Sequence, residues 1–115
     1  MSVDGWNEEG PWLTTVILGW NVRALKGVGP LEGIVAVQVH SPDGRRFAAE
    51  FGTLEVIAGL MRGYSESGEC LGGAYFFTQS LIILSEMNAP HLRRALADII
   101  ETQQIEPAFE LLGDQ

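Results

Sequence analysis

The feature that most constrains this chain is a two-residue alternation of apolar side chains on both sides of a turn. The segment GIVAVQVH, residues 33–40, carries valine at every second position near its end, and RRFAAEF, residues 45–51, carries phenylalanine and alanine with the same period. That period is typical of strands with one buried face. Between them lies SPDG, residues 41–44, in which proline fixes one backbone dihedral and glycine accepts positive φ. The two segments therefore predict an antiparallel hairpin in a sheet that buries one face.

The same alternation runs upstream from Trp12 and predicts one long strand that is strongest from Leu13 to Val22. In a single strand, Trp12 and Trp20 share one face. Large aromatic side chains at this spacing are typical of a core or an interface, and the alternative is a platform that stacks a planar ligand. The preceding MSVDGWNEEGP, residues 1–11, has no periodicity and is predicted to be a frayed N-terminal lead-in.

Two amphipathic helices are predicted from caps and helical spacing. Thr53 is a favourable N-cap residue, and apolar side chains recur at helical spacing over residues 54–64. Asn88 and Pro90 mark the start of a second helix, because proline is favoured in a first helical turn. The apolar stripe of this helix consists of Leu92, Ala95, Leu96, Ile99 and Ile100. Pro107 then predicts a short C-terminal helical turn.

The glycine-rich stretch GECLGGAYFF, residues 68–77, is predicted to be a turn that leads into a buried strand. A phosphate-binding loop would be followed by a helix and by lysine, whereas these glycines precede an alanine and three aromatic residues. The overlapping AYFFTQSLIILSE, residues 74–86, is apolar at both ends, which favours a central strand that is covered on both faces or lies in a dimer interface. Residues 78–80 interrupt it, either as a bulge or as a break between two strands. KGVGPLEG, residues 26–33, predicts a loop.

Together these segments predict a single α+β domain over residues 1–115. The chain has 46% hydrophobic and 19% charged residues, which is the composition of a globular domain rather than of a disordered one. We expect an antiparallel sheet of about four strands, two main helices packed on one face, and the short C-terminal helical turn.

The chain is acidic, because fifteen acidic residues against seven basic ones give a formal net charge of −8. This charge repels phosphate backbones and anionic lipids, so we expect no nucleic-acid or membrane partner. It favours solubility, and it would also speed association with a basic protein. A single cysteine and the lack of a secretory leader pattern predict a cytoplasmic protein.

The residues that could carry catalysis or bind a metal are dispersed along the chain. Cys70 has neither His40 nor His91 near it in sequence, which argues against a nucleophile–base pair. The sequence has no CxxC or HxxxH pair, so no zinc site is expected. We therefore predict no enzymatic activity, no catalytic residue, no metal site and no cofactor.

One resemblance rests on a long run of the sequence, GTLEVIAGLMRGYSESGECLGGAYFFTQSLIILSEMNAPHLRRALADII. The order of hairpin, helix, aromatic strand and amphipathic helix over residues 33–112 is similar to that of small bacterial immunity proteins, which neutralise polymorphic or contact-delivered toxins. The similarity is one of pattern and size and assigns no functional residue. It implies a cytoplasmic, non-enzymatic inhibitor that covers a toxin's active site, often with acidic residues against a basic nuclease.

The sequence therefore supports three hypotheses about function. The first is a non-enzymatic protein-binding module, with an immunity-type inhibitor of a basic toxin as its sharpest form. The second is a small α+β enzyme or ligand-binding protein with a pocket between sheet and helices, lined by Trp20, Tyr75 or Cys70. The third is a homodimeric structural domain whose subunits meet at residues 74–77. The partner-binding residues predicted under the first hypothesis are Glu66, Glu69, Asp98 and Glu101.

Overall fold

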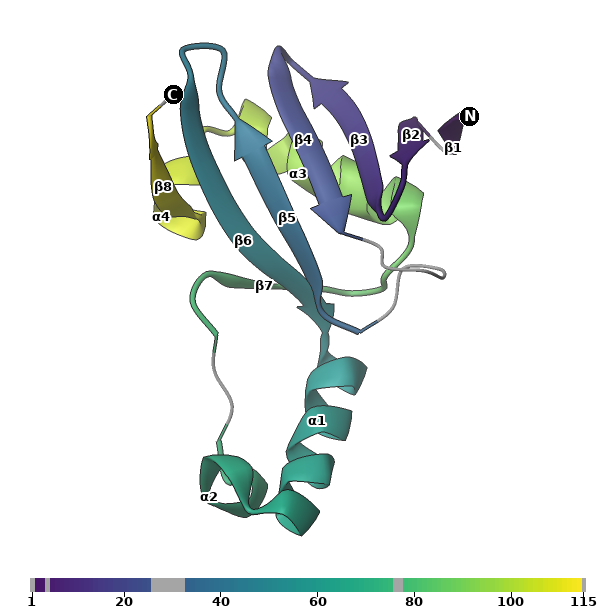
Figure 1. Cartoon of the computed structure of the whole chain (residues 1–115), viewed down its shortest axis with the longest axis vertical. Coiled ribbons are helices and arrows are strands. Elements are labelled where there is room, and N and C mark those ends of the chain that lie inside the picture. The colour runs from purple at the N-terminus through teal and green to yellow at the C-terminus, as the bar shows by residue number, and fades with distance from the viewer. Residues whose placement is uncertain (1, 4, 26–32, 76–77, 115) are drawn as a thin grey trace.

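The chain has an α+β fold, as predicted, in a computed structural model that describes residues 2–3, 5–25, 33–75 and 78–114 (Figure 1). The described part contains eight strands and four helices, so the expectation of about four strands was too low. The strands are β1 (Ser2–Val3), β2 (Trp6–Glu9), β3 (Trp12–Ile17), β4 (Trp20–Leu25), β5 (Val35–His40), β6 (Arg45–Thr53), β7 (Leu81–Leu84) and β8 (Glu110–Asp114). The helices are α1 (Leu54–Ser67), α2 (Glu69–Gly73), α3 (Ala89–Glu101) and α4 (Ile105–Ala108).

The sheet is a meander from β1 to β6 in which each strand pairs antiparallel with the next. The other edge of β6 is shared by two strands. β7 runs parallel to residues 50–53 of β6, and β8 runs antiparallel to residues 45–48. The chain therefore leaves the sheet after β6 and returns to that same strand twice.

The hairpin predicted around the SPDG turn is confirmed as β5 and β6. Val35 lies opposite Phe51, and the register continues without a break to the turn. The Gly44 N–H donates to the Ser41 carbonyl at 3.0 Å, and the Arg45 N–H donates to the Ser41 hydroxyl at 2.9 Å. The alternation therefore identified both the strands and their pairing.

The long strand predicted from Leu13 to Val22 is wrong, because the chain reverses at Leu18 and Gly19 to form the β3–β4 hairpin. Both turn residues have positive φ, 49° for Leu18 and 84° for Gly19. A two-residue turn places Ile17 opposite Trp20, so odd positions before the turn share a face with even positions after it. Trp12 and Trp20 consequently lie on opposite faces of the sheet, instead of on one.

The lead-in that was expected to be frayed contains β1 and β2. Trp6 is fully buried, and its indole Nε1 donates to the Ala89 carbonyl at the start of α3, at 2.9 Å. The Thr15 hydroxyl donates to the Gly5 carbonyl at 2.8 Å. These two hydrogen bonds tie the N-terminal strands to the sheet and to α3.

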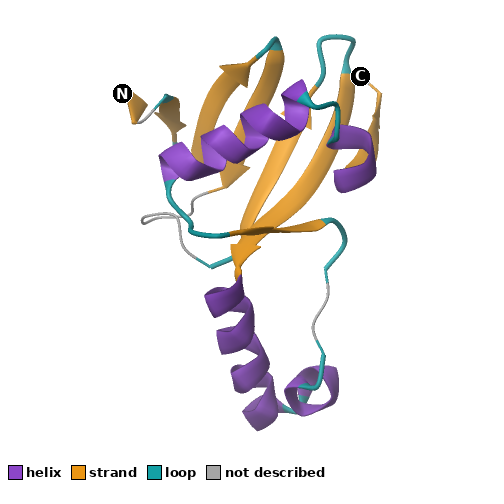
Figure 2. Cartoon of the chain, turned by 180° about the vertical axis from the view of Figure 1, so that it is seen from behind, coloured by secondary structure: helices purple, strands orange, loops and turns teal. Residues whose placement is uncertain are grey.

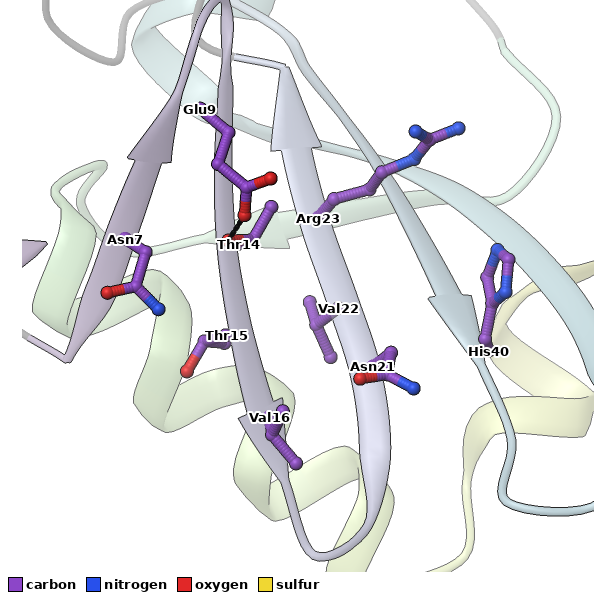
Figure 3. Close-up of a pocket in the computed structure, with 9 residues that line it drawn as sticks. All are labelled: Asn7, Glu9, Thr14, Thr15, Val16, Asn21, Val22, Arg23 and His40. Atoms are coloured by element: carbon purple, nitrogen blue, oxygen red, sulfur yellow. Dashed lines mark hydrogen bonds between the residues drawn. The ribbon is translucent and has the colours of Figure 1, made fainter.

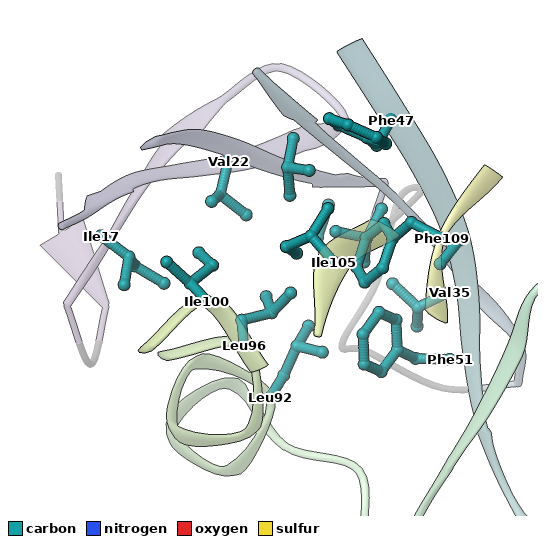
Figure 4. Packing of buried hydrophobic residues seen from close by; sticks show 14 of the residues in the cluster. Ile17, Val22, Val35, Phe47, Phe51, Leu92, Leu96, Ile100, Ile105 and Phe109 are labelled. Carbon is teal, nitrogen blue, oxygen red and sulfur yellow. The ribbon is translucent and has the colours of Figure 1, made fainter. Parts of the chain in front are cut away.

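α3 covers one face of the sheet (Figure 2). Its N-cap is Asn88, whose side-chain oxygen accepts from the His91 N–H at 2.8 Å, as the sequence predicted. Leu92 and Leu96 are fully buried and Ile100 nearly so, and they point toward the inner side chains of the sheet (Figure 4). The sheet side of this core includes Leu13, Ile17, Val22, Ala24, Val35, Val37, Val39, Phe47, Ala49 and Phe51.

α1 is also confirmed as a helix, and the Thr53 hydroxyl accepts from the Val56 N–H at 3.3 Å as its N-cap. It does not pack on the sheet, so the prediction of two main helices on one face is wrong for α1. The helix projects from the end of β6 and has no buried residue (Figure 1). No loop separates β6 from α1, because Leu54 directly follows Thr53, and the helix therefore continues outward from the strand's end.

The turn predicted at GECLGG is the short α2, in which Cys70, Leu71 and Gly72 adopt left-handed backbone angles. Gly73 packs against α1 so closely that a Cβ atom there would lie 2.1 Å from the Met61 carbonyl oxygen. The predicted strand 74–86 is reduced to β7, which begins after the interruption at residues 78–80. Residues 76–77 of that prediction, and all but Gly33 of the predicted loop 26–33, lie outside the described residues.

The C-terminal helical turn is confirmed as α4. Ile105 and Phe109 are buried, and Phe109 packs edge-on against Phe51 of β6 with ring centroids 6.0 Å apart. The chain then adds β8, a strand that the sequence analysis did not predict.

Candidate functional site

The face of the sheet opposite α3 is the first candidate site, because no helix of the described chain lies over it (Figures 1 and 2). Strand register places its side chains in transverse rows. One row crosses six strands and consists of directly opposed residues, Asn7, Thr14, Arg23, Gln38, Ala48 and Glu110. We call this surface the open face.

Arg23 is held in place at the centre of the open face. Its guanidinium carbon lies 4.3 Å from the centroid of the Trp12 ring, a cation–π geometry. Its Nε and Nη2 donate to the Gln38 side-chain oxygen at 3.0 and 2.7 Å. A guanidinium has five N–H donors, so donors remain for another group. The arrangement presents a fixed arginine beside a half-buried tryptophan.

A shallow hollow of about 440 Å³ lies on the open face beside Arg23 (Figure 3). Its polar side chains come from four neighbouring strands and include Asn7, Thr14, Asn21 and His40. The Thr14 hydroxyl donates to the Glu9 carboxylate at 2.6 Å. A second hollow of about 360 Å³ lies on the same face over β5 and β6. The open face is therefore uneven and mostly polar.

Two further features of the open face concern charge and apolar exposure. Arg46 stands directly opposite His40, and its Nε is buried without a hydrogen-bond partner among the described residues. Val16 is 58% exposed and Leu25 is 41% exposed, and both project on this face. An acidic protein thus presents two arginines here, amid exposed apolar side chains.

A second candidate site lies where the β3–β4 turn meets the junction of α3 and α4. This end cleft has a volume of about 550 Å³ and is lined by Leu18, Trp20, Arg45, Ile100, Glu101, Gln103, Ile105 and Glu106. The end cleft matches the predicted pocket between sheet and helices in one respect, because Trp20 lines it. The other two residues predicted to line that pocket, Cys70 and Tyr75, belong to the projecting α1–α2 region.

One wall of the end cleft is an ion-pair chain. Arg45 contacts Glu106 at 2.8 Å and Asp43 at 3.3 Å. The Ser41 hydroxyl, and then Arg45, lower the pKa of Asp43 below its ordinary value of 3.8. Hydrogen bonds to Glu106 and Asp43 raise the pKa of Arg45. Asp43 and Arg45 in this wall are therefore both held in their charged forms.

The four predicted partner-binding residues are all exposed, but they lie on two separate parts of the molecule. Glu66 lies in the last turn of α1 and Glu69 begins α2, at the tip of the projection. Asp98 and Glu101 lie near the end of α3, and Glu101 lines the end cleft. Figure 1 shows the two parts at opposite ends of the molecule. The four predicted partner-binding residues therefore fall into two separate acidic regions.

Cys70 and the two histidines lie on different elements, in α2, β5 and α3. The fold does make one contact that the sequence analysis missed, since the Ser85 hydroxyl lies 3.1 Å from His91 Nε2. His91 Nδ1 lies 3.6 Å from the Glu86 carboxylate. The sequence gives only a weak signal for the contact between Ser85 and His91. A serine six residues before a histidine lies close to that histidine only when the end of a strand meets the start of a helix.

Among the described residues, no group of three or more His, Cys, Asp or Glu side chains is arranged to hold a metal ion. Nor is any helix in the described ranges long and apolar enough to cross a membrane. No family model, curated protein or solved structure matches the chain.

Proposed function

We propose that this chain is a non-enzymatic protein-binding module that docks its partner on the open face. The observation that carries the proposal is the fixed Arg23, stacked on Trp12 and hydrogen-bonded to Gln38. Tryptophan and arginine contribute most of the binding energy at many protein interfaces. A side chain that is already fixed also loses less conformational entropy when the partner binds.

The surroundings of Arg23 support the same proposal. Trp12 lies opposite Leu25 in the register, and Val16 is exposed on the same strand as Trp12. Apolar side chains grouped around a polar anchor are typical of the centre of an interface, and a group of this kind on a free surface marks a binding site. The hollows on either side leave room for protruding partner side chains.

In its sharpest form, the proposed module is an immunity-type inhibitor of a basic toxin. The resemblance over residues 33–112 and the net charge of −8 support this form. The acidic regions of α3 and of the α1–α2 projection would attract a basic partner over distances of a Debye length, about 10 Å at moderate salt. Contacts on the open face would then fix the orientation of the complex.

The proposal is tested by affinity capture of a partner, followed by calorimetry with the purified pair. We expect Trp12→Ala and Arg23→Gln each to weaken binding by about 30-fold or more, since interface anchors contribute about 2 kcal/mol. The matched control is Arg94→Gln, an exposed arginine on α3, which should bind like the parent. Equal affinity of all three variants, or a bound small molecule in place of a protein partner, would contradict the proposal.

The Ser85–His91 contact supports a second candidate function, a hydrolase that uses Ser85 as nucleophile. The imidazole would accept the serine proton as the hydroxyl oxygen attacks an ester carbonyl, and it would pass that proton to the alcohol that leaves as the ester bond breaks. Water would then hydrolyse the acyl-serine to a carboxylic acid and free serine. A hollow of about 570 Å³ beside Ser85 and Glu86, at the base of α1, offers space for a substrate. A fluorophosphonate probe should then label Ser85 and not the Ser85→Ala variant. Unlabelled parent protein would exclude this function.

A further inference from the structure

The end cleft combines an apolar floor with backbone strain on both of its sides. Trp20 forms part of the floor and packs against Phe47, with ring centroids 6.0 Å apart. Ile100 and Ile105 complete the floor, and each is at least nine-tenths buried. The floor is therefore continuous with the hydrophobic core.

Leu18, at one side of the cleft, is an unfavourable residue for its place in the fold. Its φ is +49°, and its side chain is 65% exposed. Positive φ costs a non-glycine residue about 1–2 kcal/mol, and asparagine or glycine is preferred in such hairpin turns. Leucine gains nothing in this turn from burial. Its presence is explained if the exposed side chain contacts a ligand.

Gln103, at the other side of the cleft, repeats this feature with φ at +60°. Its N–H donates to the Ile100 carbonyl at 3.1 Å, which holds the tight connection from α3 to α4. Strained backbone is concentrated at binding sites in proteins. Here two strained residues, distant in sequence, face the same cleft.

The charges around the cleft define what it can bind. Glu106 is already paired with Arg45 at 2.8 Å. Glu101 is exposed and has no ion pair among the described residues. The cleft therefore has one free carboxylate above an aromatic and aliphatic floor.

We propose that the end cleft binds an arginine of a partner protein together with an apolar residue next to it. A guanidinium is planar, stacks on an indole and pairs with a carboxylate through two hydrogen bonds, so it fits Trp20 and Glu101 together. The apolar neighbour would contact Leu18. This site lies apart from Trp12 and Arg23 of the open face and does not depend on the function proposed there.

The test uses two peptides, acetyl-Leu-Arg-amide and acetyl-Leu-citrulline-amide, which differ in the charge of the side-chain head group. The readout is the ¹H–¹⁵N spectrum, in which the indole signals of Trp6, Trp12 and Trp20 are assigned with Trp→Phe variants. We expect the arginine peptide to shift Trp20 and to bind at least about tenfold more tightly than the citrulline peptide, since a charge-assisted pair is lost. Equal affinities, or shifts of Trp12 without Trp20, would overturn the proposal.

The variant Glu101→Gln should bind the arginine peptide about tenfold more weakly than the parent protein does, and it should bind the citrulline peptide with unchanged affinity. Glu55→Gln, an exposed glutamate in α1, is the matched control and should bind like the parent. Both changes are at exposed positions, and unchanged backbone signals outside the cleft would show that each variant is folded. Undiminished arginine binding by Glu101→Gln would contradict the assignment.

Discussion

α1 and α3 have similar lengths and similar amphipathic patterns, yet they have opposite roles in the fold. α3 buries Leu92, Leu96 and Ile100 against the sheet, whereas α1 buries none of its residues. The difference lies in the connections. Four residues separate β7 from α3, which lets the helix turn back over the sheet, and none separates β6 from α1. An apolar stripe therefore predicts a helix, and the loop before it determines whether the helix can reach the core.

The comparison also explains the open face. With α1 directed away from the sheet, α3 and α4 are the described helices that cover it, and both lie on the same face (Figure 2). The other face keeps its strand side chains exposed, including the Trp12–Arg23 pair. The candidate docking surface thus results from the placement of the helices.

The largest expected effect is a difference in how much a truncated leucine in α3 and one in α1 lower the free energy of unfolding. Leu96→Ala in α3 should lower the free energy of unfolding by about 2–5 kcal/mol, because the side chain is fully buried. Leu60→Ala in α1, where leucine is half-buried, should lower it by less than about 1 kcal/mol. Urea denaturation of both variants measures the difference. Equal losses would show that α1 belongs to the core.

The next largest effect concerns the packing of α2 against α1 at Gly73. Gly73→Ala should disrupt the α1–α2 contact, since φ is +90° and a Cβ would collide with the Met61 carbonyl. A helix of this length is marginal in water without packing, so amide exchange over residues 57–65 should accelerate about tenfold or more. Exchange in α3 should stay as in the parent protein. An unchanged exchange rate in α1 would contradict the proposed role of Gly73.

A smaller, stabilising effect is expected in the β3–β4 turn. Leu18→Asn should raise the free energy of unfolding by about 0.5–1 kcal/mol, because asparagine tolerates positive φ and an exposed leucine adds no burial. The same variant should bind acetyl-Leu-Arg-amide more weakly. Thermal unfolding and the peptide titration measure the two effects. A destabilised variant would show that Leu18 has a structural role.

The smallest expected effect is the pH dependence of folding stability that arises from Asp43. Because its folded-state pKa is lowered, Asp43 contributes stability above its ordinary pKa of 3.8 and loses it as the pH falls through the folded-state value. Asp43→Asn should therefore unfold at a lower temperature than the parent at pH 6, and the two midpoints should converge in acid. Parallel midpoints across this range would contradict the assignment.

The sequence predicted elements whose signals are local. The SPDG hairpin, the Thr53 and Asn88 caps and the stripe of α3 are each specified by a few neighbouring residues, and all are present. The β3–β4 turn was missed because Leu18 is not a typical turn residue and the alternation of apolar side chains runs through it without a break.

Placement in space could not be predicted in the same way. Arg23 reaches Gln38 because β4 pairs with β5, a register set by residues far apart in sequence. Glu101 and Trp20 line one cleft because α3 crosses the sheet and ends beside the β3–β4 hairpin. The sequence therefore identified Trp20 and Glu101 as candidates, and only the fold brings them into one cleft.

Docking on the open face is tested most directly by photo-crosslinking of the captured partner from the two faces of the sheet. Benzoylphenylalanine is introduced at Val16, which is 58% exposed on the open face, and separately at Arg94, which is exposed on α3. Docking on the open face predicts a covalent adduct with the partner from position 16 and none from position 94. An adduct from position 94 alone would contradict it, because the partner would then cover the helical face and leave the Trp12–Arg23 surface free.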